Sequence, residues 1–310
     1  MKLIRTRDYL LIALIGLVFL VLGGIFDRNV SQFLFVDASD TMNKVGVIIS
    51  NCALIPFFFV SIVAAVIGLF TQFNRKNEKP TWFRVLFIVI FFGLGAFLLY
   101  QGFDKLRDIG GVHSNTLGII LAIAILLVLL GCGIFVGYLM SKRYDYKVLF
   151  KYVLIFAVIV LIANALSFVM KYLWSRPRPY YIFGTEDIPA HTSFYLNFWE
   201  LQPFEAFKAP VGEYFKSFPS NHTTTSMLVL PALLLYTKLN DRFDKGIMRI
   251  IILYGVFVLA LLTGFTRMVA GAHFLSDVSF GLISGFTITY FAFFTLSCKE
   301  KKEVTTEVDN

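Results

Sequence analysis

The sequence has few charged residues and few cysteines, and each shortage excludes a class of protein. Only 15% of the 310 residues are charged, 57% are hydrophobic, and the mean hydropathy is +0.74. This composition is too apolar for a soluble globular domain and is typical of a protein with several membrane spans. Cys52, Cys132 and Cys298 all lie within or at the end of apolar runs. A disulfide framework or a cysteine-ligated metal is therefore not expected.

The sequence also lacks the arginine-rich arms and zinc-ligand sets of nucleic-acid-binding proteins. The net charge is +8, but the basic residues are scattered in short loops between apolar runs. This distribution follows the positive-inside rule of membrane proteins better than it fits a nucleic-acid surface. We therefore expect membrane lipids around the chain and no nucleic-acid partner.

Eight apolar runs are candidates for membrane spans. They cover residues 9–26, 45–73, 85–103, 109–140, 152–170, 223–237, 250–266 and 278–298. Crossing a bilayer takes about 20 apolar residues, and the run at 223–237 is short and contains Pro231. The runs are apolar all round, without the polar stripe of a soluble helix. The predicted fold is all-α, a polytopic transmembrane helical bundle of about eight spans.

The distribution of lysine and arginine predicts the orientation. With the N-terminus in the cytoplasm, the inside segments hold most of the 28 basic residues, so both termini are expected inside, in a plasma or inner membrane. The longest connection, residues 174–221, then lies outside the cytoplasm. Its aromatic part, residues 180–218, is expected on the bilayer interface, either as a roof over a site or as a structural cap. The tail at 299–310 is expected to be a disordered cytoplasmic segment.

One stretch places three charged or titratable side chains at the ends of apolar runs. Arg267 closes one run, and His273 and Asp277 open the next. In a helix that starts near His273, Asp277 follows at the i, i+4 spacing, where its carboxylate can fix the tautomer of the imidazole and raise its basicity. The pair predicts a nucleophile or base with its orienting group, and Arg267 suits a phosphoryl oxygen. The alternative is a capping histidine and a membrane-anchoring arginine.

Two further stretches carry similar groups. Lys171 lies in the last turn of the fifth run, and prolines on both sides of Arg178 force the chain out of the helix there. This arrangement suits a fixed anion ligand, or else basic residues that snorkel at a span end. The sixth run begins with Pro-Ser-Asn-His, in which Ser220 or Asn221 is a candidate N-cap and His222 lies on the rim of the helix N-terminus. Such an N-terminus can bind an anion, or else it is that of an ordinary capped helix.

By the predicted topology, these three stretches emerge on the same face of the membrane. Two histidines, one carboxylate, three cations and a helix N-terminus then converge there. This is the inventory for in-line phosphoryl transfer without a metal, in which cations neutralise the oxygens, one histidine attacks and another protonates the leaving oxygen. The sequence therefore predicts no metal and no cofactor.

The three stretches resemble the signature of the phosphatidic acid phosphatase type 2 superfamily. Residues 171–179 read Lys-x6-Arg-Pro, residues 219–222 read Pro-Ser-Asn-His, and residues 267–277 read Arg-x5-His-x3-Asp. The spacing within each part matches the family signature. Two positions depart from it, because Asn221 stands where glycine is usual and Thr266 stands where serine is usual.

The resemblance implies a metal-independent integral membrane lipid phosphatase. Residues 82–298, including the loop 174–221, would form a six-helix phosphatase core, to which residues 1–81 add two further transmembrane helices. His273 would be the nucleophile that forms a phosphohistidine, oriented by Asp277, and His222 would be the acid for the leaving group and then the base for water. The remaining signature residues would bind phosphate, namely Lys171, Arg178, Ser220, Asn221 and Arg267.

A membrane enzyme of this kind takes a lipid phosphate or diphosphate whose head group reaches the interface. Phosphatidic acid, phosphatidylglycerol phosphate and a polyprenyl diphosphate such as undecaprenyl diphosphate all fit. A phosphotransferase of the same superfamily would keep every signature residue and replace water by a second lipid. A vanadium haloperoxidase is similar in these motifs, but that group is soluble. A transporter would place its charges near the midplane of broken helices, whereas here they cluster at the ends of the runs.

Overall fold

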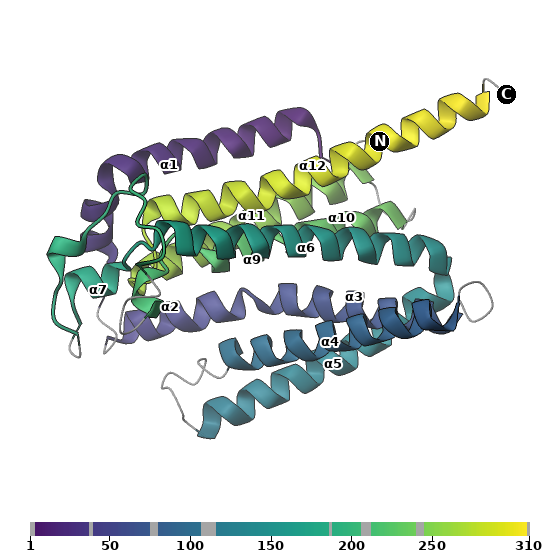
Figure 1. Cartoon of the computed structure of the whole chain (residues 1–310), viewed down its shortest axis with the longest axis horizontal. Coiled ribbons are helices and arrows are strands. Elements are labelled where there is room, and N and C mark those ends of the chain that lie inside the picture. The colour runs from purple at the N-terminus through teal and green to yellow at the C-terminus, as the bar shows by residue number, and fades with distance from the viewer. Residues whose placement is uncertain are drawn as a thin grey trace. The chain divides into compact units, whose positions relative to one another are not determined.

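The computed structural model describes residues 4–36, 40–74, 80–106, 116–185, 188–205, 212–239 and 245–308. Within these ranges the chain forms helices joined by loops and turns, without a β-strand (Figure 1). The all-α fold class expected from the apolar runs is therefore confirmed. The start of the fourth predicted run, residues 109–115, lies outside the described residues.

Seven helices are long: α1 (Thr6–Leu34), α3 (Ile55–Asn74), α4 (Thr81–Leu106), α5 (Thr116–Arg143), α6 (Tyr146–Trp174), α11 (Lys245–Val269) and α12 (Leu275–Val308). The shorter elements are α2 (Thr41–Cys52), α7 (Pro179–Phe183), the 3-10 helices η2 (Thr192–Phe194) and η3 (Gly212–Phe215), α9 (Asn221–Met227) and α10 (Val229–Leu239). Among the described residues, seven helical segments are long and apolar enough to cross a membrane, with α2 and α3 forming one of them. The chain is a multi-pass membrane protein.

The sixth predicted span is broken into two helices. α9 ends at Met227, α10 begins at Val229, and Leu228 between them bonds only as a turn, from its backbone N to the carbonyl of Thr225 at 3.0 Å. Pro231 explains the break, because it has no N–H for the carbonyl four residues earlier and its ring crowds that carbonyl. The expected count of about eight spans therefore becomes seven long helices and one interrupted run.

The C-terminal tail differs from the prediction. The sequence predicts disorder from residue 299, whereas α12 continues as helix to Val308. Lysine and glutamate, which dominate residues 299–303, have high helix propensity, and lengthening an existing helix needs no new nucleation. The charged residues from 299 onward can therefore continue the helix that the apolar part of α12 has begun.

The contacts divide the chain into two compact units. One comprises residues 1–46 and 159–310, and the other comprises residues 47–158. In the second unit, α3 packs against α4 and α5; in the first, α1 packs along α12, and α9 packs on both α11 and α12. All of the predicted site residues belong to the first unit, which we call the site unit.

Glycines on α1 allow it to approach α12 closely. A Cβ atom added at Gly16 would lie 2.5 Å from Cγ1 of Ile283, and one added at Gly23 would lie 2.6 Å from the backbone N of Ser276. Small residues at helix contacts are typical of membrane bundles, because they let backbones come together. Asp27, one turn beyond Gly23, thereby reaches the first turn of α12. The division expected from the sequence leaves α1 outside the core, whereas the structure packs it on the helix that carries the signature aspartate.

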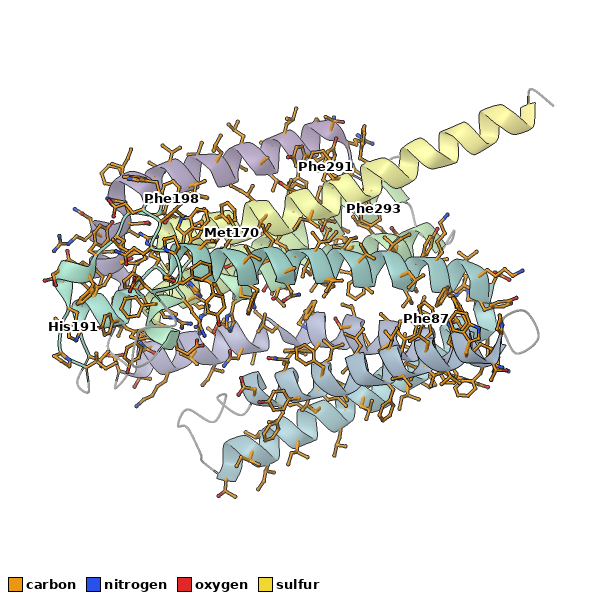
Figure 2. All side chains as sticks on the ribbon, viewed as in Figure 1. Phe87, Met170, His191, Phe198, Phe291 and Phe293 are labelled. Carbon is orange, nitrogen blue, oxygen red and sulfur yellow. The ribbon has the colours of Figure 1, made fainter. Side chains whose placement is uncertain are left out.

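The loop between α6 and α9 folds over one end of the site unit, the left end in Figure 1. Tyr181 stacks on His191 at 4.5 Å and on Tyr214 at 5.0 Å between ring centroids. Figure 2 shows Phe198 beside α1, where a Cβ atom on Gly24 would lie 2.7 Å from its ring. Aromatic packing thus holds this loop against the helices whose ends carry the signature.

Candidate active site

Backbone hydrogen bonds tie the first part of the signature to the segment that leads into α9. The backbone N of Arg178 donates to the carbonyl of Tyr214 at 2.8 Å, and the backbone N of Ser217 donates to the carbonyl of Arg176 at 3.0 Å. Ser175 adopts a φ of 39°, in the left-handed region, which ends α6 and turns the chain back into the protein. The prolines predict a fixed backbone at Arg178, and the hydrogen bonds to residues 214–217 reinforce it.

Further backbone bonds join the third part of the signature to the other two. The backbone N of Tyr180 donates to the carbonyl of Gly271 at 2.9 Å, and that of Ser220 donates to the carbonyl of Asp277 at 3.0 Å. Gly281 lets α9 and α12 approach here, because a Cβ atom on it would lie 2.6 Å from the carbonyl oxygen of Ser220. All three parts of the signature thus meet at one end of the site unit.

His273 lies in the tight loop between α11 and α12 and is only 2% exposed. Its Nδ1 is 2.6 Å from the backbone carbonyl oxygen of Ser217. A carbonyl oxygen can only accept, so Nδ1 must carry the hydrogen and Nε2 keeps its lone pair. This tautomer is the one that a nucleophilic imidazole needs.

The surroundings of His273 keep its imidazole uncharged. Burial is the largest cause that lowers its pKa, to about 3, and the charges of Lys171, Arg178 and Arg267 act in the same direction, while Asp277 opposes them. At neutral pH the ring is therefore neutral, with its lone pair available. All three signature cations thus oppose a positive charge on His273.

Asp277 is fully buried, and its carboxylate is held by several donors. Oδ1 accepts from Nη1 of Arg176 at 2.7 Å, and Oδ2 accepts from the backbone N of Phe274 at 2.8 Å and from Oγ of Ser217 at 2.5 Å. Oδ2 lies 3.9 Å from Nδ1 of His273, a distance for electrostatic attraction but too long for a hydrogen bond. The sequence predicts that the carboxylate of Asp277 fixes the tautomer of His273, whereas in the structure the carbonyl of Ser217 bonds Nδ1 and the hydroxyl of Ser217 bonds Asp277.

Three residues of this arrangement were missed by the sequence reasoning: Asp27, Arg176 and Ser217. Arg176 is fully buried, and its Nη2 lies 2.9 Å from Oδ2 of Asp27 on α1. Its Nη1 also donates to Oγ of Ser276 at 2.8 Å, and its guanidinium lies 4.0 Å from the ring centre of Phe274. Asp27 could have been found from the sequence, because it is a lone carboxylate directly after an apolar run. Ionisable residues in membrane helices usually have a function.

The cations expected to bind phosphate surround the loop of His273. Nζ of Lys171 donates to the carbonyl of Lys216 at 2.7 Å. Nη2 of Arg178 lies 3.3 Å from Oε2 of Glu213, while its Nε is buried without a hydrogen-bond partner among the described residues. Arg267 lies in the last turn of α11. A buried N–H donor without a partner suits an anion that enters this site.

The second part of the signature forms the N-terminus of α9. Ser220 occupies the N-cap position, as expected, but its Oγ pairs with Oγ1 of Thr223 at 3.0 Å and not with a backbone N–H. Asn221 lines a pocket together with Lys171, and His222 follows it in the first turn. Thr266 uses its Oγ1 within α11, bonding the carbonyls of Leu262 and Thr263. In the part of the chain that the structure describes, no group of three His, Cys, Asp or Glu side chains is placed to hold a metal ion.

Comparison with known proteins gives one match. The family model of the PAP2 superfamily matches residues 152–299, which include every residue of the three-part signature. The match supports the phosphatidic acid phosphatase type 2 superfamily for this part of the chain. No curated protein and no solved structure matched the chain.

The match to the PAP2 superfamily confirms the resemblance carried by the signature and supports a phosphatase with a lipid-related function. The matched residues begin within α6, so α1 lies outside them. The PAP2 part of the chain nevertheless receives a buried carboxylate, Asp27, from α1.

Proposed function

We propose that this PAP2 superfamily protein is an integral membrane lipid phosphatase that works through a phosphohistidine on His273. The observation that carries the proposal is the state of that side chain. It is buried, and its Nδ1 donates to the carbonyl of Ser217 at 2.6 Å, which leaves the lone pair on Nε2, while burial and the charges of Lys171, Arg178 and Arg267 lower its pKa. Cations that neutralise phosphoryl oxygens and a fixed nucleophile are the main requirements of phosphoryl transfer.

In the first step, Nε2 of His273 attacks the phosphorus and forms a P–N bond while the P–O bond to the lipid breaks. His222 donates a proton to the departing oxygen, so a neutral alcohol leaves, or a lipid monophosphate when the substrate is a diphosphate. Lys171, Arg178 and Arg267 would hold the phosphoryl oxygens. The imidazole becomes positive in this step, and the carboxylate of Asp277, 3.9 Å from its Nδ1, stabilises that charge.

In the second step, a water molecule attacks the phosphorus of the phosphohistidine. His222, now neutral, accepts a proton from the water, and the P–N bond breaks with its electron pair returning to Nε2. Inorganic phosphate leaves, and His273 regains the tautomer that began the cycle. In this scheme the charge on the phosphoryl oxygens is balanced by side chains, without a metal ion.

The substrate is a lipid phosphate or diphosphate, and the site is proposed to face away from the cytoplasm with both termini inside. A lipid phosphotransferase is the second candidate, because it needs the same residues. Labelled acceptor lipid separates the two: a hydrolase releases free phosphate in proportion to lipid product, whereas a phosphotransferase moves the phosphoryl group to the acceptor.

The decisive experiment measures phosphate release by the purified full-length protein from a panel of lipid phosphates and diphosphates. The wild type is compared with His273→Ala and with His191→Ala, a histidine that stacks on Tyr181 in the loop. We expect His273→Ala to lose at least a thousandfold in activity and His191→Ala to keep it. If His273→Ala released phosphate as fast as the wild type, the role of His273 as the nucleophile would be refuted.

A further inference from the structure

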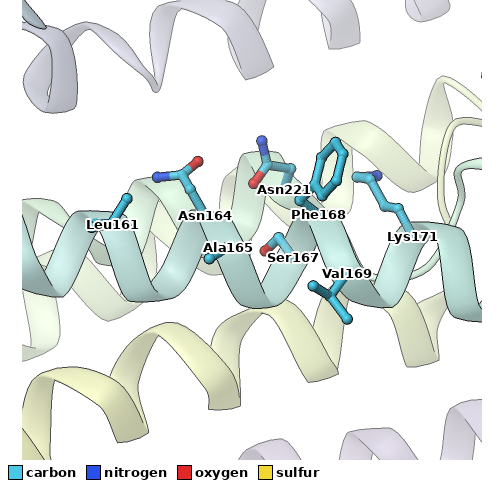
Figure 3. Close-up of a pocket in the computed structure, with 8 residues that line it drawn as sticks. All are labelled: Leu161, Asn164, Ala165, Ser167, Phe168, Val169, Lys171 and Asn221. Carbon is cyan, nitrogen blue, oxygen red and sulfur yellow. The ribbon is translucent and has the colours of Figure 1, made fainter.

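A pocket of about 420 Å³ opens on α6 next to the signature residues (Figure 3). One face of α6 and the first residue of α9 line it. Its apolar walls are well exposed, with Leu161 at 68% and Phe168 at 61%. Within the site unit, these exposed apolar residues form a wall that suits the hydrocarbon part of a lipid.

The pocket continues into the site proposed for phosphate. Lys171 and Asn221 belong to its lining, and they are also the signature residues at the end of α6 and at the start of α9. A ligand in this pocket therefore has its charged end at Lys171 and the rest of its length along the apolar face of α6. This is the position for the lipid part of the substrate.

Asn164 is the polar exception on this face. Its side chain is exposed, and Nδ2 donates one hydrogen to the carbonyl of Val160 at 2.8 Å. The second N–H and the amide oxygen remain for a ligand. An amide that keeps one N–H and its oxygen unbonded is costly in hydrocarbon, so the presence of Asn164 beside Leu161 and Phe168 indicates a further polar partner at this depth.

The spacing along α6 tells where that partner lies. Asn164 precedes Lys171 by seven residues, which places both on the same face about 10.5 Å apart along the helix axis. Figure 3 shows both side chains projecting to the same side of α6, as does Phe168. Asn164 is nearer the middle of the helix. The polar group that it contacts is therefore closer to the bilayer centre than the phosphate.

We propose that Asn164 donates a hydrogen bond to an ester carbonyl of a glycerolipid whose phosphate lies at Lys171. The inference rests on the proposed phosphatase function and narrows its substrate to a diacylglycerol phosphate, such as phosphatidic acid or phosphatidylglycerol phosphate. In these lipids the ester groups follow the phosphate on the side of the tails. A polyprenyl diphosphate has only hydrocarbon at that position and leaves the second N–H of the Asn164 amide unbonded.

The test compares a diester phosphatidic acid with its dialkyl ether analogue, which lacks both carbonyls, and with a polyprenyl diphosphate. The purified full-length protein is assayed in mixed micelles at a fixed mole fraction of each lipid. The wild type is expected to prefer the diester over the ether by about tenfold in kcat/KM, the effect of one hydrogen bond to a buried ligand. Asn164→Leu is expected to lose that preference by reacting more slowly with the diester only, and Asn164→Gln to restore part of it.

Ile162→Leu is the matched control, because Ile162 is 49% exposed on α6 and does not line the pocket. It is expected to change none of the three rates. Equal wild-type rates on diester and ether, or faster hydrolysis of the polyprenyl diphosphate, would overturn the role of Asn164 while leaving the phosphatase function intact. Absence of phosphate release from every lipid would instead reject the proposed function itself.

Discussion

Asp27→Asn is the substitution that tests whether α1 takes part in the reaction. Arg176 lies between two carboxylates, at 2.9 Å from Asp27 and 2.7 Å from Asp277, and all three side chains are at most 1% exposed. Removing one partner of a buried ion pair costs about 3–5 kcal/mol. Because Arg176 keeps its second carboxylate, we expect the lower value, about 3 kcal/mol, which corresponds to roughly a hundredfold change in an equilibrium.

Part of this free energy is expected to appear in catalysis. Without Asp27, the guanidinium of Arg176 is free to shift, and the carboxylate of Asp277 shifts with it. We therefore predict that kcat falls by at least tenfold, whereas KM does not rise, because Asp27 is not among the residues proposed to bind phosphate. Phosphate-release kinetics give the two constants, and thermal unfolding in detergent reports the loss of stability.

Asp8→Asn is the matched control, since it breaks a similar ion pair at the other end of the same helix. Asp8 pairs with Arg249 of α11, and both residues are buried. Its loss should lower the unfolding temperature by a comparable amount while leaving kcat unchanged at temperatures where the protein is folded. If the two variants retain the same kcat, Asp27 contributes to stability alone and the reasoning for α1 is wrong.

Four shorter predictions follow from the site and its surroundings. The pKa of His273 is near 6.5 in the unfolded chain and is lowered to about 3 in the folded protein. The free energy of unfolding is therefore expected to fall as the pH drops from 6.5 toward 3, by about 3 kcal/mol at pH 4. Thermal unfolding of wild type and His273→Asn checks this, and identical pH dependences would contradict it. Gly23→Ala should lower the unfolding temperature and the activity together, because the added Cβ would lie 2.6 Å from the backbone N of Ser276, whereas Gly255→Ala points into open space and should do neither; equal effects would exclude a tight contact at Gly23. Vanadate, a phosphoryl mimic, should inhibit and EDTA should not, so strict dependence on Mg²⁺ would argue against the mechanism. Ser193→Cys in the exposed loop should react with an impermeant thiol reagent in intact cells, and labelling only after lysis would invert the topology.

The sequence predicted those features that depend on short spacings. Apolar runs predicted helices, and the i, i+4 spacing of His273 and Asp277 placed both at the start of α12 or just before it. The break at Leu228 was only partly foreseen from Pro231, since a proline ends a helix in one context and kinks it in another.

Contacts between residues far apart in the chain could not be predicted in this way. Arg176 and Asp27 are separated by 149 positions, and Ser276 and Asp27 by 249. No local pattern connects them, and the bonding depends on how closely α1 and α12 pack. Ser217 was missed for a related reason. Its role depends on two bonds to distant residues, from its carbonyl to His273 and from its hydroxyl to Asp277.

The charges of the site explain why a second carboxylate near Arg176 is compatible with the proposed phosphate binding. Four cations and two buried carboxylates meet there, namely Lys171, Arg176, Arg178, Arg267, Asp27 and Asp277. With every group ionised, this set carries two positive charges, which a phosphomonoester dianion neutralises. Asp27→Asn adds one positive charge, so inorganic phosphate should inhibit this variant more strongly than the wild type even as kcat falls. Weaker inhibition by phosphate would mean that Arg176 had moved away from the site and taken its charge with it.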